Sequence, residues 1–267
     1  VFDIAKAKSE IFEGAKPPEI TIIPKDSPYT DFLENKARKH GIKNIYSFGS
    51  SDGADAQLLS YDCGNDRIYV KAKILDTLVD YELRCCNIST VHNSIMALLA
   101  VHLISKIPLT EITALLPSFK TLPGRGEMII LKNCDIMIID DSYNASPTSM
   151  KSAIMSLSKR QCLRKIAVLG DMLELGAESA HLHENLAPAI DKFGIDLVFA
   201  CGEMSRCLFY NLTERKRGCW CETSAELADK VLNEIKNGDC LLIKGSNPMK
   251  MNIIVEAIRR RCSEIAA

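Results

Sequence analysis

The stretch that decides the fold of this chain is Asp140-Asp141-Ser142-Tyr143-Asn144-Ala145-Ser146-Pro147, directly after the apolar run Ile136-Met137-Ile138-Ile139. The apolar run predicts a buried strand, and the residues from Thr148 onward have the pattern of a helix. Ser146 can cap this helix, and Pro147 fits its first position, where no backbone donor is needed. A strand thus delivers two carboxylates, a phenol and an amide to one strand-to-helix turn, the kind of turn at which α/β sheets bind ligands.

The chain beyond Ile136 alternates regularly between short apolar runs and helical patterns. We expect strands at residues 136–139, 165–169, 196–200, 219–221 and 240–243. We expect helices at residues 148–159, 179–192, 203–212, 223–236 and 249–262. Such alternation predicts an α/β domain with a mostly parallel sheet, covered on both faces, whose strand ends lie on one rim.

The part before Ile136 has a different rhythm, which places a domain boundary near that residue and divides the chain into residues 1–135 and 136–267. Ile68, Val70 and Ala72 alternate with polar residues, and this period of two predicts antiparallel hairpins with one wet face. Further strands are expected at residues 21–23, 44–48 and 125–131, and helices at residues 1–12, 31–40, 91–104 and 109–116.

The composition is that of an ordinary globular protein. The chain has 267 residues, 47% of them hydrophobic and 25% charged, which suits a globular protein of one large domain or two ordinary ones. A net charge of −1 gives no general field that would recruit nucleic acid or a membrane surface. The sequence has no apolar stretch of the roughly 18–20 residues that a membrane span needs, and the start, Val1-Phe2-Asp3, does not resemble a signal peptide. We therefore expect a cytoplasmic protein that binds neither nucleic acid nor membrane.

The eleven cysteines fit a reducing compartment. Cys134, Cys201 and Cys240 lie in apolar runs and are expected to be buried thiols. Cys85 and Cys86 are adjacent, and Cys219-Trp220-Cys221 is one residue too tight for a C-x-x-C metal knuckle, so the sequence disfavours a zinc site.

The run Asp141–Pro147 resembles the D-A-Y-N-A-N-P signature of the Mur ligases. Five other segments match motifs of that family in the family's order: Ala7-Lys8-Ser9-Glu10-Ile11-Phe12, His92-Asn93, Pro123-Gly124-Arg125, Leu169-Gly170-Asp171-Met172-Leu173-Glu174-Leu175-Gly176 and Lys244-Gly245-Ser246. The resemblance covers nearly the whole chain. It implies that residues 1–135 are the C-terminal part of the family's central ATP-binding domain, and that residues 136–267 are its Rossmann-like C-terminal domain.

Within that family the chain resembles the members that join D-alanyl-D-alanine to UDP-N-acetylmuramoyl-tripeptide in peptidoglycan precursor synthesis. The resemblance implies ATP and Mg²⁺ as cofactors, an acyl phosphate intermediate and a monomer. The sequence contains no G-x-x-x-x-G-K-[ST] phosphate loop. In the family this loop precedes the segment around Lys8. We therefore expect the chain to be the second half of such an enzyme and to be inactive alone.

The resemblance also assigns roles to residues of the ATP site. Lys8 would be carbamylated and would then bridge Mg²⁺ ions as a carboxylate, whereas without the resemblance it is a solvent-facing helix lysine. His92 and Asn93 would lie near the adenine, although His92 could equally be a helix cap or a core histidine. Arg125 would hold phosphate or ribose through its fork of donors, or be a surface arginine. Asp141 would bind the ribose hydroxyls, while its plain reading is a helix-start carboxylate.

Four residues are candidates for substrate binding. Tyr143 and Asn144 would line the site near the incoming dipeptide, and Lys244 and Ser246 would form an anion site for the dipeptide carboxylate. His183 also matches a family histidine, for which the sequence suggests no role.

Two departures from the family pattern keep alternatives open. Met96 stands where H-N-x-x-N has its second asparagine, and Pro24-Lys25-Asp26-Ser27 stands where the family has N-x-D-D. Both favour a non-catalytic nucleotide-binding remnant. A related ligase, which adds an amino acid to the muramoyl chain or glutamates to folate, is a second alternative, but the residues Tyr143-Asn144-Ala145 argue against it.

Overall fold

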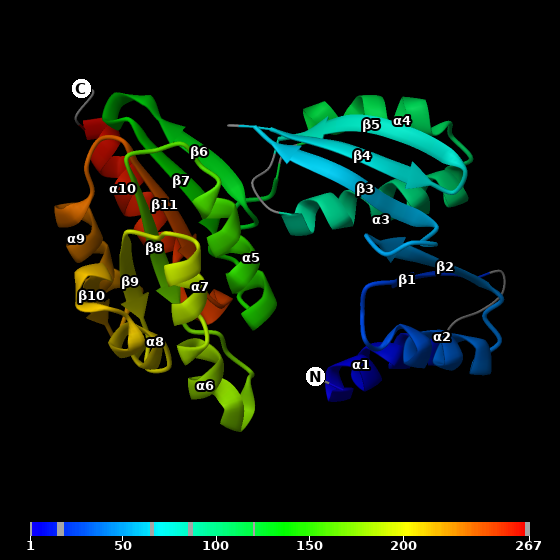
Figure 1. Cartoon of the computed structure of the whole chain (residues 1–267), viewed down its shortest axis with the longest axis horizontal. Coiled ribbons are helices and arrows are strands. Elements are labelled where there is room, and N and C mark those ends of the chain that lie inside the picture. The colour runs from blue at the N-terminus through cyan, green and yellow to red at the C-terminus, as the bar shows by residue number, and fades with distance from the viewer. Residues whose placement is uncertain (1, 15–18, 65–66, 85–87, 120, 265–267) are drawn as a thin grey trace. The chain divides into compact units, whose positions relative to one another are not determined.

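The computed structural model describes residues 2–14, 19–64, 67–84, 88–119 and 121–264. The chain forms two compact units, shown in Figure 1. The first contains Val1–Leu83 and Thr90–Phe119, and the second contains Arg84–Ser89 and Lys120–Ala267. Each unit has its own sheet, with strand order β1-β2-β3-β4-β5 in the first and β10-β9-β8-β11-β7-β6 in the second.

The sheet of the first unit is mixed. Strands β1, β2 and β3 pair in parallel, whereas β3, β4 and β5 form antiparallel hairpins. The strands are β1 (Ile20–Pro24), β2 (Asn44–Gly49), β3 (Ala56–Cys63), β4 (Ile68–Ile74) and β5 (Thr77–Leu83). Along β4 every second residue is buried. The alternation of apolar and polar residues along β4 therefore corresponds to a strand with one buried and one exposed face, as predicted.

The helices of this part of the chain are α1 (Phe2–Ser9), α2 (Thr30–Lys39), α3 (Ile88–Ser105) and α4 (Leu109–Leu115). The predicted helix at residues 1–12 is shorter, because a 3₁₀ turn replaces the α-helix from Glu10 to Gly14. By length and composition α3 could cross a membrane. However, Ile95, Leu98 and Leu99 are buried, so α3 has the packed face of a core helix and is weak support for a span.

The sheet of the second unit is parallel except at one edge. Strands β8 (Arg164–Gly170), β9 (Leu197–Cys201), β10 (Arg217–Cys221) and β11 (Asp239–Lys244) run parallel to β7 (Ile136–Asp141), and β11 lies between β7 and β8. The exception is β6 (Glu127–Leu131), which pairs antiparallel with β7. The sequence rhythm changes at Ile136, but the sheet begins earlier. The β6–β7 hairpin adds β6 as an edge strand before the first parallel crossover.

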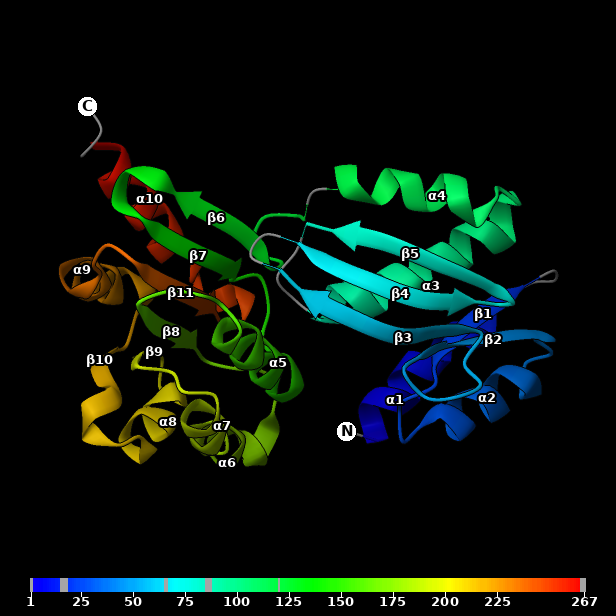
Figure 2. The same ribbon diagram turned by 45° about the horizontal axis from the view of Figure 1, so that its top comes forward.

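Helices cover both faces of this sheet (Figures 1 and 2). On one face the core contains residues of α5 (Pro147–Ser158), α7 (Ala187–Lys192) and α8 (Ser205–Asn211). On the other face it contains residues of α9 (Ser224–Glu234) and α10 (Asn252–Glu264). Cys134, Cys201 and Cys240 are buried, as predicted. The covered parallel sheet and the mixed sheet confirm the α/β class.

Two predicted helices differ from the structure for local reasons. Residues 179–192 form two helices, α6 (Ser179–Glu184) and α7, because Pro188 has no N–H to donate to the carbonyl one turn back. Residues 247–249 form a 3₁₀ turn, and Lys250 is left-handed with φ 51°. Helix α10 therefore begins at Asn252 rather than at residue 249.

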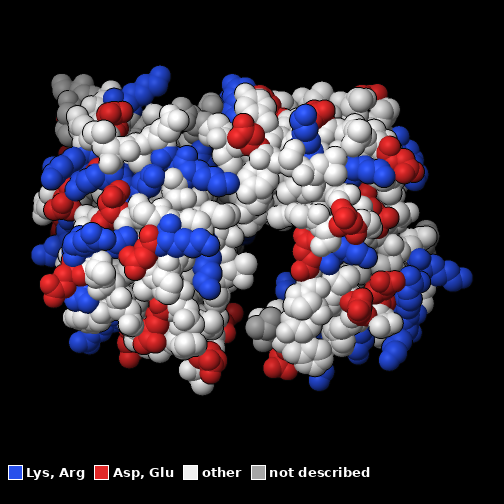
Figure 3. Space-filling model, viewed as in Figure 1, with Lys and Arg blue, Asp and Glu red and all other residues white. Residues whose placement is uncertain are grey.

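Charged side chains are mixed over the face seen in Figure 3, where Lys and Arg are interspersed with Asp and Glu. This face carries no continuous field of one sign, consistent with the net charge of −1.

Candidate functional site

Polar side chains gather where four parallel strands of the second sheet end. Strands β7, β8, β9 and β11 end at Asp141, Gly170, Cys201 and Lys244, and the carboxyl ends of parallel strands share one edge of a sheet. We call the turns that follow these four strands the rim. The rim contains Asp141, Asn144, Asp171, Ser205, Lys244 and Ser246.

Asp141 and Lys244 form a buried ion pair at the rim. They face each other because Lys244 is in register with Asp141 on the neighbouring strand. Lys244 Nζ donates to Asp141 Oδ2 and to the carbonyl oxygen of Asn144, both at 2.7 Å. Burial raises the pKa of the Asp141 carboxyl, and the charge of Lys244 opposes that shift. The ammonium of Lys244, whose side chain is 3% exposed, is thus engaged inside the protein.

The turn after β7 is fixed by its own side chains. Ser146 caps α5 by accepting from the Ser149 backbone N–H, and Pro147 occupies the first helical turn, as predicted. Ser142 N donates to Asp140 Oδ1 at 3.2 Å, and Ala145 N donates to Asn144 Oδ1 at 2.8 Å. These bonds hold the backbone so that Tyr143 and Asn144 are exposed at the rim.

The segment before β6 packs onto the same turn. Tyr143 N donates to the Gly124 carbonyl at 2.9 Å, and the Arg125 guanidinium lies over the Tyr143 ring, 4.0 Å from its centroid. Gly124 has φ +75°, and a Cβ there would lie 3.1 Å from Tyr143 N, so the position requires glycine. The motif around Gly124 and the turn after β7 therefore form one surface, on which an aromatic ring supports the guanidinium.

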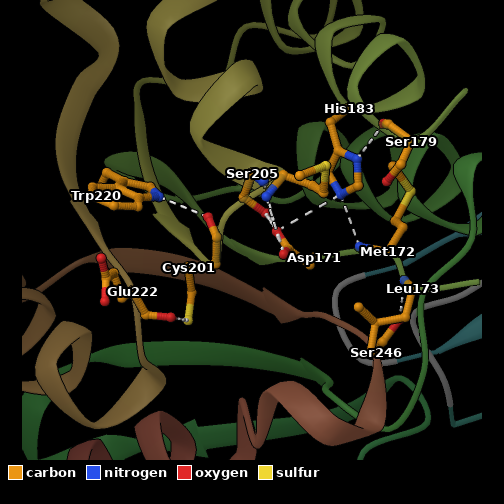
Figure 4. Close-up of polar contacts among 12 residues, drawn as sticks. Asp171, Met172, Leu173, Ser179, His183, Cys201, Ser205, Trp220, Glu222 and Ser246 are labelled. Carbon is orange, nitrogen blue, oxygen red and sulfur yellow. Dashed lines mark hydrogen bonds and ion pairs between the residues drawn. The ribbon is translucent and has the colours of Figure 1, made fainter. Parts of the chain in front are cut away.

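Asp171 ties the end of β8 to the end of β9 (Figure 4). Its carboxylate accepts from Ser205 N at 2.6 Å, Ser205 Oγ at 2.7 Å and Met204 N at 3.2 Å. It occupies the space beside Gly202, where a Cβ would come within 2.5 Å of the carboxyl carbon. Ser246 ties β11 to the same loop, since its N–H donates to the Asp171 carbonyl and its Oγ accepts from Leu173 N, both at 2.9 Å.

His183 has a structural role in this network (Figure 4). Its side chain is buried, Nε2 accepts from Met172 N at 2.9 Å, and Nδ1 is 2.7 Å from the Ser179 carbonyl oxygen. The bond from Met172 assigns the proton to Nδ1. Ser205, His183 and Asp171 are the residue types of a hydrolase triad, but Ser205 donates to the carboxylate and not to the imidazole. They stabilise the loop and do not activate a nucleophile.

A second polar cluster lies in the first unit. The Asp26 carboxylate accepts from Ser50 N at 2.7 Å and Ser51 N at 2.8 Å, while His92 Nε2 is 3.1 Å from Ser50 Oγ. Gly49 is required here, since a Cβ would overlap the Asp26 carboxylate at 2.6 Å. Burial lowers the pKa of His92, and the negative charge of Asp26 opposes that shift. The glycine-rich loop after β2 is therefore anchored by the segment that replaces N-x-D-D.

Other predicted ATP-site residues are more isolated. Lys8 lies in the last turn of α1 and is exposed, and Asn93 is exposed on α3. Across residues 2–14, 19–64, 67–84, 88–119 and 121–264, no group of three or more His, Cys, Asp or Glu residues could hold a metal ion. The role of Lys8 toward Mg²⁺ therefore stays a prediction, and it would require further ligands from bound nucleotide or from outside these residues.

Comparisons with known proteins match both units. Residues 1–101 match the family described as "Mur ligase middle domain", and residues 124–247 match "Mur ligase, glutamate ligase domain". The chain belongs to the Mur ligase family. It is 30% identical over 255 residues to the UDP-N-acetylmuramoyl-tripeptide–D-alanyl-D-alanine ligase of Rickettsia prowazekii, covering 95% of this chain and 56% of the relative. It is 29% identical to the Escherichia coli enzyme of the same name, covering 96% and 55%.

Solved Mur ligase structures agree with the fold. MurF from Acinetobacter baumannii is 25% identical, with a TM-score of 0.82 over 96% of this chain and 55% of that chain. MurF from Thermotoga maritima in complex with ADP has a TM-score of 0.81 at 23% identity, over 98% and 58%, which is a likeness of fold. The chain spans about half the length of the curated relatives it matches.

Membership of the Mur ligase family leaves the roles of single residues as predictions, but their placement is clear. The structure brings Arg125, Asp141, Tyr143, Asn144 and Lys244 together. Ser246 lies on the same rim, where it binds the Leu173 backbone. His92 belongs to the polar cluster of the first unit, and Asn93 is the next residue along α3. Sequence reasoning missed the Asp26–Ser50 contact, for which the only signal was the glycine-rich loop at Gly49.

Proposed function

We propose that this Mur ligase chain supplies the second half of an ATP-dependent ligase that joins D-alanyl-D-alanine to UDP-N-acetylmuramoyl-tripeptide. The observation that carries the proposal is the rim surface built by Arg125, Tyr143, Asp141 and Lys244, which unites three of the motifs that resemble the family. The names of the relatives support the choice of substrates. We also propose that the enzyme is cytoplasmic and monomeric.

For the nucleotide we propose two groups of contacts. Arg125 is exposed and oriented by Tyr143, so its fork of N–H donors can bind phosphate or ribose oxygens. Asp141 accepts from Lys244 through Oδ2, and its carboxylate would also accept hydrogen bonds from the ribose hydroxyls. His92 and Asn93 would lie near the adenine. ATP and Mg²⁺ are the proposed cofactors, and when bound the metal would neutralise charge on the transferring phosphoryl oxygens.

For the dipeptide we propose the exposed part of the rim. Asn144 Oδ1 already accepts from Ala145 N, so its amide nitrogen is the group that can donate to substrate. Lys244 shapes this surface by holding the Asn144 carbonyl, and it would meet the dipeptide carboxylate only when its pair with Asp141 opens. Ser246 contributes by fixing the Leu173 backbone. Tyr143 would line the same surface with its ring edge.

The proposed reaction forms an amide bond in two steps. The terminal carboxylate of the tripeptide attacks the γ-phosphorus of ATP, ADP leaves, and an acyl phosphate forms. The amine of D-alanyl-D-alanine then attacks the acyl carbon, phosphate leaves with the electron pair of the C–O bond, and the amine loses its proton. The acyl phosphate turns a poor leaving group into a good one, which is why one ATP is consumed for each bond.

A chimera tests this proposal. The region of the Rickettsia prowazekii ligase that aligns with this chain is replaced by residues 1–267, and phosphate release is measured with ATP, UDP-N-acetylmuramoyl-tripeptide and D-alanyl-D-alanine. We expect release that requires all three substrates, at a rate on the order of 1–10 per second. This chain alone is the matched control and should release none, since its sequence has no phosphate-loop pattern.

Met96, in place of the second family asparagine, favours the alternative of a nucleotide-binding protein without catalysis. A folded chimera that binds ATP and releases no phosphate would support that alternative and refute the proposal. Release that proceeds with a free amino acid in place of the dipeptide would instead indicate a related ligase.

A further inference from the structure

Cys219 and Cys221 place two thiols side by side on strand β10. They are two residues apart, so their side chains point to the same face of the strand. Their Sγ atoms are 3.9 Å apart, and both residues are partly exposed. Strand β10 stands at one end of the strand order, so the pair lies at the edge of the second sheet.

The backbone between the two thiols is held in place. Trp220 points to the opposite face, and its Nε1–H donates to the Gly202 carbonyl at 2.8 Å, as Figure 4 shows. Gly202 N in turn donates to the Cys221 carbonyl at 3.1 Å. The Arg206 guanidinium lies 5.0 Å from the centre of the Trp220 ring. These contacts hold the backbone at Trp220 and Cys221. The distance between the two thiols can therefore change mainly through side-chain rotation.

The sulfur separation suits a bridging ion better than a disulfide. A direct S–S bond is about 2.05 Å long, so closing it from 3.9 Å would require this anchored strand to contract. A single ion with metal–sulfur bonds of about 2.3 Å spans the same 3.9 Å with an S–metal–S angle of about 116°. An ion held by two thiolates alone prefers a wider, near-linear angle, which side-chain rotations that move the two sulfurs apart would supply. The segment therefore accepts a two-coordinate ion through side-chain rotation, with the strand unchanged.

The number of thiols selects the kind of ion. Structural zinc almost always takes four ligands, and no group of three or more suitable side chains exists in the described ranges of the chain. Cys201 lies opposite Cys221 in register, but it is buried and its thiol donates to the Glu222 carbonyl at 3.8 Å. Thiolates select soft ions, among them monovalent copper. Unlike zinc, Cu(I) also forms stable sites with only two ligands.

We propose that Cys219 and Cys221 form a two-thiolate binding site for Cu(I). Binding replaces the two thiol protons, which pass to solvent, and forms two Cu–S bonds with no change in oxidation state of sulfur or copper. The site is separate from the proposed ligase site, since it lies on β10, whereas the proposed substrate contacts lie on the turn after β7.

The test is an anaerobic titration of the full chain, fully reduced, with Cu(I) against a chromogenic Cu(I) chelator. The chain has eleven cysteines, so the quantity that decides is the difference between variants. We expect C219S and C221S each to bind one Cu(I) equivalent fewer than the parent chain. The matched control is C207S, which removes a partly buried thiol of α8 and should bind as the parent does.

Two further measurements protect the test from misfolded variants. C219A and C221A should lose the same Cu(I) equivalent while their thermal melts stay unchanged. X-ray absorption of the copper that the parent chain binds and these variants do not should show sulfur ligands only. Equal copper binding by the parent and C219S would overturn the proposal, as would a loss confined to C207S. Tight Zn(II) binding that C219S abolishes would show that the pair belongs to a larger site and that the assigned ion is wrong.

Discussion

Replacing Lys244 with methionine should destabilise the second unit strongly. Met keeps most of the side-chain length but removes the ammonium that donates to Asp141 Oδ2 and to the Asn144 carbonyl. The Asp141 side chain is 10% exposed, so its carboxylate would remain buried without a counter-charge. Breaking a buried pair from one side costs about 3–5 kcal/mol. With a urea m-value of about 2 kcal/mol/M, the unfolding midpoint should fall by ~2 M.

Trp220 makes this measurement specific to the second unit. It is the single tryptophan of the chain and lies in β10, so its fluorescence during a urea titration follows the unfolding of that sheet. The double variant D141N/K244M removes the orphaned charge as well. We expect it to be about 2–3 kcal/mol more stable than K244M, since the cost lies in the unpaired carboxylate rather than in the missing attraction.

The deficit of K244M should also depend on pH. The pKa of Asp141 is already raised by burial, and loss of the opposing Lys244 charge should raise it further. The folded variant then holds the Asp141 proton more tightly than the unfolded chain does, so its stability increases as pH falls below that pKa toward about 4. The difference from the parent should be largest at neutral pH. A K244M variant that loses less than ~1 kcal/mol, or that D141N destabilises further, would refute this reasoning.

Three further predictions concern the other contacts of the two units. In the chimeric ligase, Y143L should raise the KM for ATP about 2- to 5-fold, because an exposed cation–π contact contributes roughly 0.5–1 kcal/mol. Y143F keeps the ring and should leave the KM for ATP unchanged. Equal effects of both variants would show that the ring does not position Arg125. H183A should lower the stability of the second unit by about 1–3 kcal/mol in the Trp220 urea assay, since it leaves the buried Met172 N–H without its acceptor. H183Q should recover part of that loss, and an H183A midpoint equal to the parent's would contradict the assigned role. D26N should lower the pKa of His92 further in an NMR titration, because the Asp26 charge opposes the lowering by burial, and an upward shift would show that the cluster is misassigned.

Much of the fold is visible in local sequence because burial repeats along each strand. The apolar run of β7 and the turn that ends with Ser146 and Pro147 specify a strand, a cap and a helix within a dozen residues. The antiparallel hairpins of the first unit follow from the alternation along β4. Pro188 divides a predicted helix, and this break could have been read from the missing N–H of proline alone.

The parts that sequence did not predict are contacts between distant residues. The membership of β6 in the second sheet depends on its pairing with β7 rather than on its own pattern. The pairing of Lys244 with Asp141, 103 residues earlier, follows from strand register, and the motif around Lys244 does not reveal it. Its binding of a substrate carboxylate stays a prediction. The Asp26–Ser50 contact likewise joins two turns through the approach of β1 to β2. Register and pairing partners are properties of the assembled sheet, so single motifs do not reveal them.

The proposed function depends most directly on whether this chain can complete a dipeptide-adding ligase. The decisive measurement is the mass of the product formed by the Rickettsia prowazekii chimera from ATP, UDP-N-acetylmuramoyl-tripeptide and D-alanyl-D-alanine. We predict a product heavier than the tripeptide substrate by one dipeptide less one water, formed in equal amount to the ADP released. ADP release by the folded chimera with no gain in mass of the tripeptide substrate would contradict the proposed function.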